Sequence, residues 1–171
     1  MVVSSRVKIL QTLRQWQIPY TLFEHAPVHT MEDCLHIEGI DWEKTEMPKN
    51  VFLCNRQKTA FYLMLLCHGT PFRTAHVSKA LGVSRLSFAP DALLPEMLGL
   101  MAGAVSPLGL LFDVQGHVSL AMDRGLRGFE RLAFHPCDNT ATVVLSAQDF
   151  FGGFLKRIQR APVEIDALAQ T

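Results

Sequence analysis

The chain has 171 residues, of which 49% are hydrophobic and 19% are charged. This composition excludes a disordered chain, and the length predicts a single domain over residues 1–171. The 16 basic and 16 acidic residues give a formal net charge of zero, whereas proteins that grip long nucleic acids carry a basic excess. The charge therefore excludes a protein that wraps RNA, although a few local cations can still hold one short RNA end.

Membrane insertion, export and disulfide bonding are not expected. No apolar run reaches the roughly 20 residues that a membrane span needs. The start of the chain, Met1 to Arg6, lacks the basic and apolar regions of an export signal. The cysteines form no CxxC pair, which argues against a structural zinc site and fits a reducing cytoplasm. They are Cys34, Cys54, Cys67 and Cys137.

The first half of the chain mixes helical and strand patterns. Apolar residues at helical spacing follow Ser4, Thr30 has Asp33 three residues on, and β-forming residues are dense after residue 50. The expected elements are a helix capped by Ser4 or Ser5 and ended by Pro19, a strand over 20–24, a short helix from an N-cap at Thr30 through Ile37, an exposed polar loop over 38–48, and a hairpin of strands 51–55 and 60–67.

The second half continues the mixture without a regular alternation of strand and helix. The expected elements are a helix over 76–81 stopped by Gly82, a strand over 85–88, a helix from Pro90 or Asp91 through Leu98, a hairpin of strands 110–114 and 117–122 around Gln115-Gly116, strands over 131–135 and 140–145, and a helix capped by Ser146 through about residue 158. This order predicts an α+β fold with a mixed or antiparallel sheet rather than a doubly wound one.

Three short motifs occur at the borders of these elements. Lys49-Asn50 leads into the strand at Val51, and Gly103 to Pro107 reads Gly-Ala-Val-Ser-Pro between a helix and an expected strand. His135 opens the third motif, His-Pro-Cys-Asp-Asn-Thr-Ala-Thr. Each motif is weak alone, because GxxxP occurs by chance in many proteins. Together, in this order, they resemble the YbaK/ProX family of aminoacyl-tRNA editing domains, especially its free-standing prolyl-tRNA-associated deacylases.

The resemblance covers about residues 7 to 155 and implies a curled, partly closed sheet with helices packed around it. It implies that the loop of Gly103, Ala104, Val105, Ser106 and Pro107 is catalytic, because its backbone N–H groups surround the ester carbonyl. Such a loop needs only small side chains, which explains why the motif is so plain.

The resemblance also implies a set of substrate-binding residues. Lys49 would contact the terminal nucleotide of the tRNA, since a compact ammonium neutralises a phosphate, and Asn50 would support it. His135 would limit the volume of the amino-acid pocket more than it transfers protons. Asn139 would hold its loop through side-chain bonds to the backbone, or touch the substrate. His25 and Thr30 match a His-x4-Thr element that lines the pocket.

Other site chemistries find little support in the sequence. His25 and His29 have the spacing of a helical zinc pair, but Pro27 lies between them and makes a helix improbable. Cys54 lies in a hydrophobic strand, where a thiol is usually inert. Neither a P-loop nor a dinucleotide-binding fingerprint occurs, so no metal and no cofactor are expected.

The predicted function is hydrolysis of a mischarged amino acid, alanine in the favoured case, from tRNA for proline. The family is thought to use a water molecule oriented by the 2′-hydroxyl of the substrate, which fits the lack of an evident side-chain base. A pocket too small for proline admits alanine, and recognition of the tRNA acceptor end or of prolyl-tRNA synthetase supplies further selectivity. Neither DNA nor a membrane is an expected partner. The alternatives are a Cys-tRNA deacylase of the same fold, a non-catalytic module that binds tRNA or a synthetase, and a generic esterase.

Overall fold

The computed structural model describes residues 1–167, so the last four residues of the expected 1–171 domain lie outside the described residues. The α-helices are α1 (Ser5–Gln15), α2 (Met31–Leu35), α3 (Thr74–Leu81), α4 (Leu94–Leu98) and α5 (Leu155–Arg157). Short 3-10 helices are η1 (Asp91–Leu93), η2 (Pro107–Phe112) and η3 (Arg124–Gly128), and η4 (Asp149–Phe154) is a π-helix. None of the helices in residues 1–167 is both long and apolar enough to cross a membrane.

The strands form two separate sheets. They are β1 (Thr21–Glu24), β2 (Thr45–Glu46), β3 (Lys49–Cys54), β4 (Phe61–Leu66), β5 (Ser87–Phe88), β6 (Val118–Asp123), β7 (Arg131–Phe134), β8 (Ala141–Ser146) and β9 (Val163–Ile165). One sheet has the order β1-β8-β7-β2 and the other the order β5-β3-β4-β6-β9. Each sheet combines antiparallel and parallel pairs, since β2 runs parallel to β7 and β6 runs parallel to both β4 and β9. The expected α+β class with mixed sheets and surrounding helices is confirmed.

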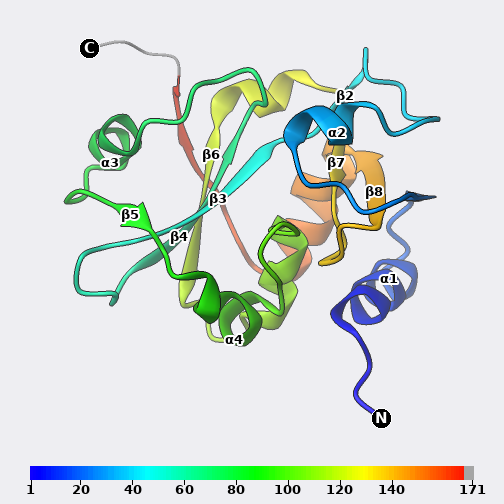
Figure 1. Ribbon diagram of the computed structural model, residues 1–171, viewed down its shortest axis with the longest axis horizontal. Coiled ribbons are helices and arrows are strands. Elements are labelled where there is room, and N and C mark those ends of the chain that lie inside the picture. The colour runs from blue at the N-terminus through cyan, green and yellow to red at the C-terminus, as the bar shows by residue number, and fades with distance from the viewer. Residues whose placement is uncertain (168–171) are drawn as a thin grey trace.

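Three hydrophobic clusters hold these layers together. The largest joins both sheets and receives α1, α4 and the η4 helix; Phe52 and Leu63 enter it from one sheet and Phe134 and Val143 from the other. A second cluster lies between the outer face of the five-stranded sheet and α3. The third lies on the outer face of the four-stranded sheet, which α2 and the following loop cover. Figure 1 shows α1 and α3 at opposite ends of the molecule.

Several expected elements are confirmed with shifted ends. The α1 helix has Ser4 as its N-cap, whose hydroxyl accepts a hydrogen bond from the N–H of Val7. The α2 helix begins after Thr30 with the expected capping box to Asp33. Strands β3 and β4 form the expected hairpin, and α3 ends at Gly82, which has a left-handed φ of 69°. The hydroxyl of Ser146 accepts from the N–H of Asp149 at the start of the last helical segment.

The expected hairpin of 110–114 with 117–122 is wrong. Residues Pro107–Phe112 form η2, because the Ser106 hydroxyl caps it by accepting from the Leu108 N–H at 3.2 Å and Pro107 presets a helical φ. The following strand, β6, pairs with β4 instead. Its residues Leu120, Ala121 and Met122 are at most 3% exposed, and a strand so apolar on both faces gains more between two strands than beside a short hairpin partner.

The exposed loop expected over 38–48 is wrong at its C-terminal end. Residues 45–48 are buried, and Thr45–Glu46 forms β2 beside β7. The Glu46 carboxylate accepts hydrogen bonds from the backbone N–H of His68 and from its ring Nδ1, the latter at 2.9 Å. These bonds provide the partners that a buried carboxylate requires. The segment therefore connects the two sheets instead of lying free in solvent.

Candidate active site

A cavity of about 220 Å³ brings the three sequence motifs together. Asn50 from β3, Gly103 and Val105 from the GxxxP loop, and His135 after β7 all line it. The remaining lining residues come from the start of α2 and the segment before β3. They are Val28, His29, Thr30, Met31, Cys34, Met47 and Pro48. None of the lining residues, all of which belong to the described part of the chain, is an Asp, Glu, Lys or Arg.

The loop of Gly103 to Pro107 contributes Gly103 and Val105 to the lining of this cavity. Gly103 has a φ of 87°, a left-handed conformation that favours glycine. The N–H of Ala104 donates to the carbonyl of Met101 at 3.1 Å, so it is already used. The N–H groups of Gly103 and Val105 donate to no group within residues 1–167. Ser106 and Pro107 are buried and fix the loop to η2.

His135 lies in the wall of the cavity in one defined tautomer. Its Nδ1 is 2.8 Å from the carbonyl oxygen of Ala141, which can only accept, so Nδ1 carries the proton. The Nε2 atom therefore presents a lone pair, and the Cys34 thiol lies 3.8 Å from it. His25 packs beside the His135 ring with 6.1 Å between centroids, and its Nε2 lies 2.9 Å from the Thr142 hydroxyl. These bonds hold the His135 ring with Nε2 as an acceptor.

Burial keeps both His135 and Cys34 neutral. Desolvation lowers the pKa of His135 below its usual 6.5, the bond to Ala141 opposes this, and the nearby His25 lowers the pKa further. Desolvation also raises the pKa of the Cys34 thiol, and Asp33 adds to that shift. The pair is therefore a thiol beside a neutral imidazole, which differs from the thiolate and imidazolium of a cysteine nucleophile.

The lowered pKa of His135 predicts a stability loss in mild acid. The contribution of neutral His135 to the free energy of unfolding is complete above the unfolded-state pKa of 6.5. It is lost as the pH falls towards the lower folded-state pKa, because the unfolded chain then binds a proton that the native protein does not. The slope contributed by this one group reaches at most about 1.4 kcal/mol per pH unit. Urea unfolding between about pH 8 and pH 5 is expected to show a shallower decline for His135→Gln than for the wild type. Equal slopes in the two proteins would contradict this account.

Lys49 and Asn50 are neighbours in β3 and point to opposite faces of the sheet, as the period of two in a strand requires. Asn50 lines the cavity; its Nδ2 donates to the carbonyl of Pro48 at 3.2 Å, and its Oδ1 is buried without a hydrogen-bond partner in the described residues. Lys49 does not line the cavity, and its Nζ donates to the carbonyl of Thr70. The structure thus separates this predicted pair.

The other predicted residues take different places around the cavity. Thr30 lines it, but its hydroxyl accepts from the N–H of Asp33 at 3.0 Å and so caps α2. His25 and Asn139 lie outside the lining, and the Asn139 Nδ2 donates to the carbonyl of Val28 at 3.1 Å. The predicted residues that the cavity brings together are therefore Asn50, Gly103, Val105, His135 and Thr30.

Sequence reasoning missed the apolar part of the lining. Met31 and Cys34 are three residues apart on α2 and both face the cavity, while Met47 enters from the segment before β3. The capping box at Thr30 gave the start of this helix, so the spacing of Met31 and Cys34 on one face was a usable signal. No comparable signal marked Met47, because the segment containing it was expected to be exposed.

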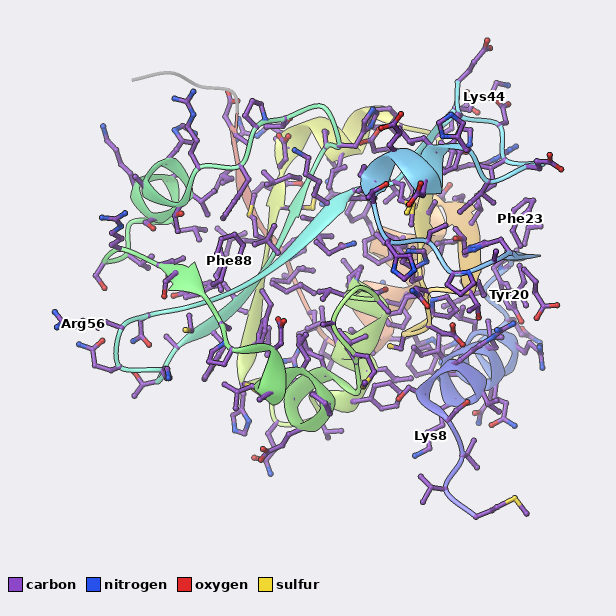
Figure 2. The ribbon with its side chains drawn as sticks, viewed as in Figure 1. Lys8, Tyr20, Phe23, Lys44, Arg56 and Phe88 are labelled. Atoms are coloured by element: carbon purple, nitrogen blue, oxygen red, sulfur yellow. The ribbon has the colours of Figure 1, made fainter. Side chains whose placement is uncertain are left out.

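Three of the basic side chains lie far apart on the surface. Figure 2 shows Lys8, Lys44 and Arg56 projecting from well-separated parts of the molecule. In residues 1–167 no group of three or more His, Cys, Asp or Glu side chains is placed to hold a metal ion. The distribution of charge agrees with the neutral composition and leaves the cavity itself uncharged.

This fold is that of an aminoacyl-tRNA editing domain. The model of that family matches residues 25–152, a range that includes all three motifs. The chain belongs to this family and is accordingly an aminoacyl-tRNA hydrolase, as the sequence analysis predicted.

Individual relatives are similar over nearly their whole length. The prolyl-tRNA editing protein ProX of Acetoanaerobium sticklandii is 35% identical over 151 residues, which cover 87% of this chain and 90% of that protein. The prolyl-tRNA synthetase associated domain-containing protein 1 of Danio rerio is 30% identical, with 94% of this chain and 86% of that protein covered.

Solved structures share the fold at low identity. The crystal structure of the hypothetical protein APE2540 superposes with a TM-score of 0.70 at 14% identity, covering 92% of this chain and 98% of that one. A candidate trans-editing enzyme for prolyl-tRNA synthetase gives a TM-score of 0.69 at 14% identity, covering 97% and 99%. At this identity the likeness concerns the fold alone.

Proposed function

We propose that this protein is a trans-editing deacylase that removes alanine from tRNA for proline by hydrolysing the ester to the terminal ribose. The observation that carries the proposal is the cavity in which unpaired backbone donors, a neutral histidine and small or flexible apolar side chains meet. Relatives named for prolyl-tRNA editing and for association with prolyl-tRNA synthetase support proline-specific tRNA as the substrate and that synthetase as a partner. We place the reaction in the cytoplasm and in one domain spanning residues 1–171.

The chemistry follows from the groups in the lining. The ester carbonyl accepts from the N–H groups of Gly103 and Val105, which stabilise the oxyanion when water adds to the carbonyl carbon. Donors of this kind contribute about 3–4 kcal/mol each to the transition state. The tetrahedral intermediate then expels the ribose 3′-oxygen, which takes up the proton that the added water gives up, and alanine leaves as the free acid. The 2′-hydroxyl of the substrate orients the water in this mechanism, in which none of the described lining residues supplies a carboxylate base.

Selectivity rests on size. Val28, Met31 and Met47 give the cavity apolar walls, which suit the methyl group of alanine. The proline ring needs two further methylene positions, and one extra methylene changes selectivity by about 10–200-fold in pockets of this kind. Glycine and serine are small enough to enter, so the tRNA acceptor end or the synthetase supplies the remaining discrimination.

The test is deacylation of tRNA for proline charged with alanine, proline, cysteine or serine, using chelator-treated protein. Loss of alanine with proline retained is the expected result. Loss of cysteine in preference to alanine would assign the protein to Cys-tRNA hydrolysis on the same fold. Binding of the acceptor end without loss of any amino acid, even with prolyl-tRNA synthetase added, would contradict the hydrolase and leave an accessory binding module.

Because Lys49 lies outside the cavity lining, we assign it a phosphate of the tRNA acceptor end rather than the aminoacyl group. Lys49→Ala is therefore expected to raise KM for Ala-tRNA about tenfold, the effect of one lost contact of about 1.4 kcal/mol to a phosphate, with little change in Tm. Lys49 lies at the start of β3 beside Asn50 and is only partly buried, so its removal leaves no cavity. Lys58→Ala is the matched control, because Lys58 is exposed beyond the opposite end of the same strand. Steady-state kinetics and thermal melts of both variants distinguish a role of Lys49 in tRNA binding from a role in stability. A large fall in Tm with unchanged KM would show that Lys49 acts only through its bond to Thr70.

A further inference from the structure

One wall of the cavity is held in place from outside by Asn139. The segment after β1 supplies Val28 and then the start of α2 to the lining. Beyond the last β1–β8 pair, Glu24 with Ala141, this segment keeps contact with the chain before β8. The N–H of Val28 donates to the carbonyl of Asn139 at 3.2 Å, and the Asn139 Nδ2 donates to the carbonyl of Val28 at 3.1 Å. One residue thus binds both backbone groups of Val28.

The wall has few other attachments at this point. Pro27 lacks a backbone N–H and cannot extend the ladder. The neighbouring bonds lie on either side of Val28: the N–H of His25 donates to the carbonyl of Thr140 at 3.0 Å, and the N–H of His29 donates to the Asp33 carboxylate at 3.3 Å. The Asn139 amide therefore supplies the side-chain bond that fixes Val28 between Pro27 and the capped start of α2.

Asn139 does this without facing the cavity. It lies outside the lining and borders a separate hollow of about 530 Å³ with Ser4, Met101 and Ala104. Its side chain is therefore not placed to contact an aminoacyl group in the cavity.

We propose that Asn139 is a positioning residue that sets the width of the cavity through Val28 and thereby the discrimination between alanine and proline. This inference rests on the proposed function. Loss of the Asn139 amide frees the Val28 carbonyl, the wall moves outward, and the larger proline side chain gains access.

Asn139→Ala and Asn139→Asp test the proposal, because the aspartate keeps the size of the side chain but cannot donate to the Val28 carbonyl. Both variants are expected to lower the ratio of Ala-tRNA to Pro-tRNA deacylation about tenfold, the lower end of what one methylene is worth in a pocket. The change should arise from faster loss of proline, with kcat for alanine retained. Amide hydrogen exchange of residues 26–31 should become faster in both variants.

Asn55→Ala is the control, because Asn55 also holds a loop through its side chain but lies at the far end of β3. Its Nδ2 donates to the Thr59 hydroxyl at 2.9 Å, and its Oδ1 accepts from the Thr59 N–H at 2.8 Å. It should change neither the ratio nor the exchange of 26–31. An unchanged ratio in the Asn139 variants, or an equal fall for both substrates, would overturn the proposal. Unchanged exchange would also overturn it. If the wild type failed to deacylate Ala-tRNA, the proposed function would fall, and the exchange measurement would still decide whether Asn139 holds this wall.

Discussion

Gly103→Val is expected to lower kcat/KM for Ala-tRNA by a factor of about 10²–10³, the cost of losing one oxyanion donor. Gly103 has a φ of 87°, and a β-branched residue at that angle is a strong outlier. The backbone must rotate to relieve the strain, and the N–H of Gly103 then loses the orientation in which we propose that it binds the ester carbonyl. A Cβ at Gly103 would meet no atom within 4 Å, so the effect comes from the backbone and not from a clash with the core.

Gly82→Val provides a matched control. Gly82 ends α3 with a φ of 69°, and a Cβ there also meets nothing within 4 Å. Both substitutions should cost about 1–3 kcal/mol of stability through backbone strain, but only the change at Gly103 should affect turnover. Single-turnover deacylation and urea unfolding of the two variants separate the effects. Wild-type kcat/KM in Gly103→Val would remove the loop from the mechanism.

The sequence predicted the local elements of this fold better than their partners. Caps at Ser4 and Thr30 and the β3–β4 hairpin depend on residues close in the chain, and all three are confirmed. The parallel pairing of β6 with β4 and β9 joins segments far apart in the chain. A strand that is apolar on both faces is stabilised between two other strands, but no short sequence pattern predicts which strands these are.

The candidate site shows the same division. The motifs identified Asn50, Gly103, Val105 and His135, and the cavity brings these four together. The expected strand begins at Val51 and leaves Lys49 and Asn50 before it, whereas both belong to β3 and so point to opposite faces. Cys34 and Met47 reach the cavity only because α2 and the buried segment before β3 pack on the outer face of the four-stranded sheet.

Asp113→Ala is expected to reduce the free energy of unfolding by about 3 kcal/mol, at the lower end of what breaking a buried ion pair costs. Asp113 is 5% exposed and ends η2, the segment that continues from the GxxxP loop. Its carboxylate accepts from the N–H groups of His117 at 2.9 Å and Val118 at 2.8 Å, and from Arg160 Nη2 at 3.2 Å. Removing it leaves a guanidinium with 19% of its side chain exposed and no balancing charge.

Glu164→Ala is the comparison for this pair, because Glu164 meets Arg127 in an ion pair whose side chains are 32% and 48% exposed. Water screens that pair, so its loss should cost less than about 1 kcal/mol. Urea unfolding measures both, and the double variant Asp113→Ala with Arg160→Met should recover part of the loss, since no unpaired charge then remains. Equally small losses of unfolding free energy in the two single variants would show that water solvates the Arg160 guanidinium when Asp113 is absent. Deacylation per folded molecule should stay at the wild-type level in Asp113→Ala, because the loop keeps its own anchor at Ser106 and Pro107.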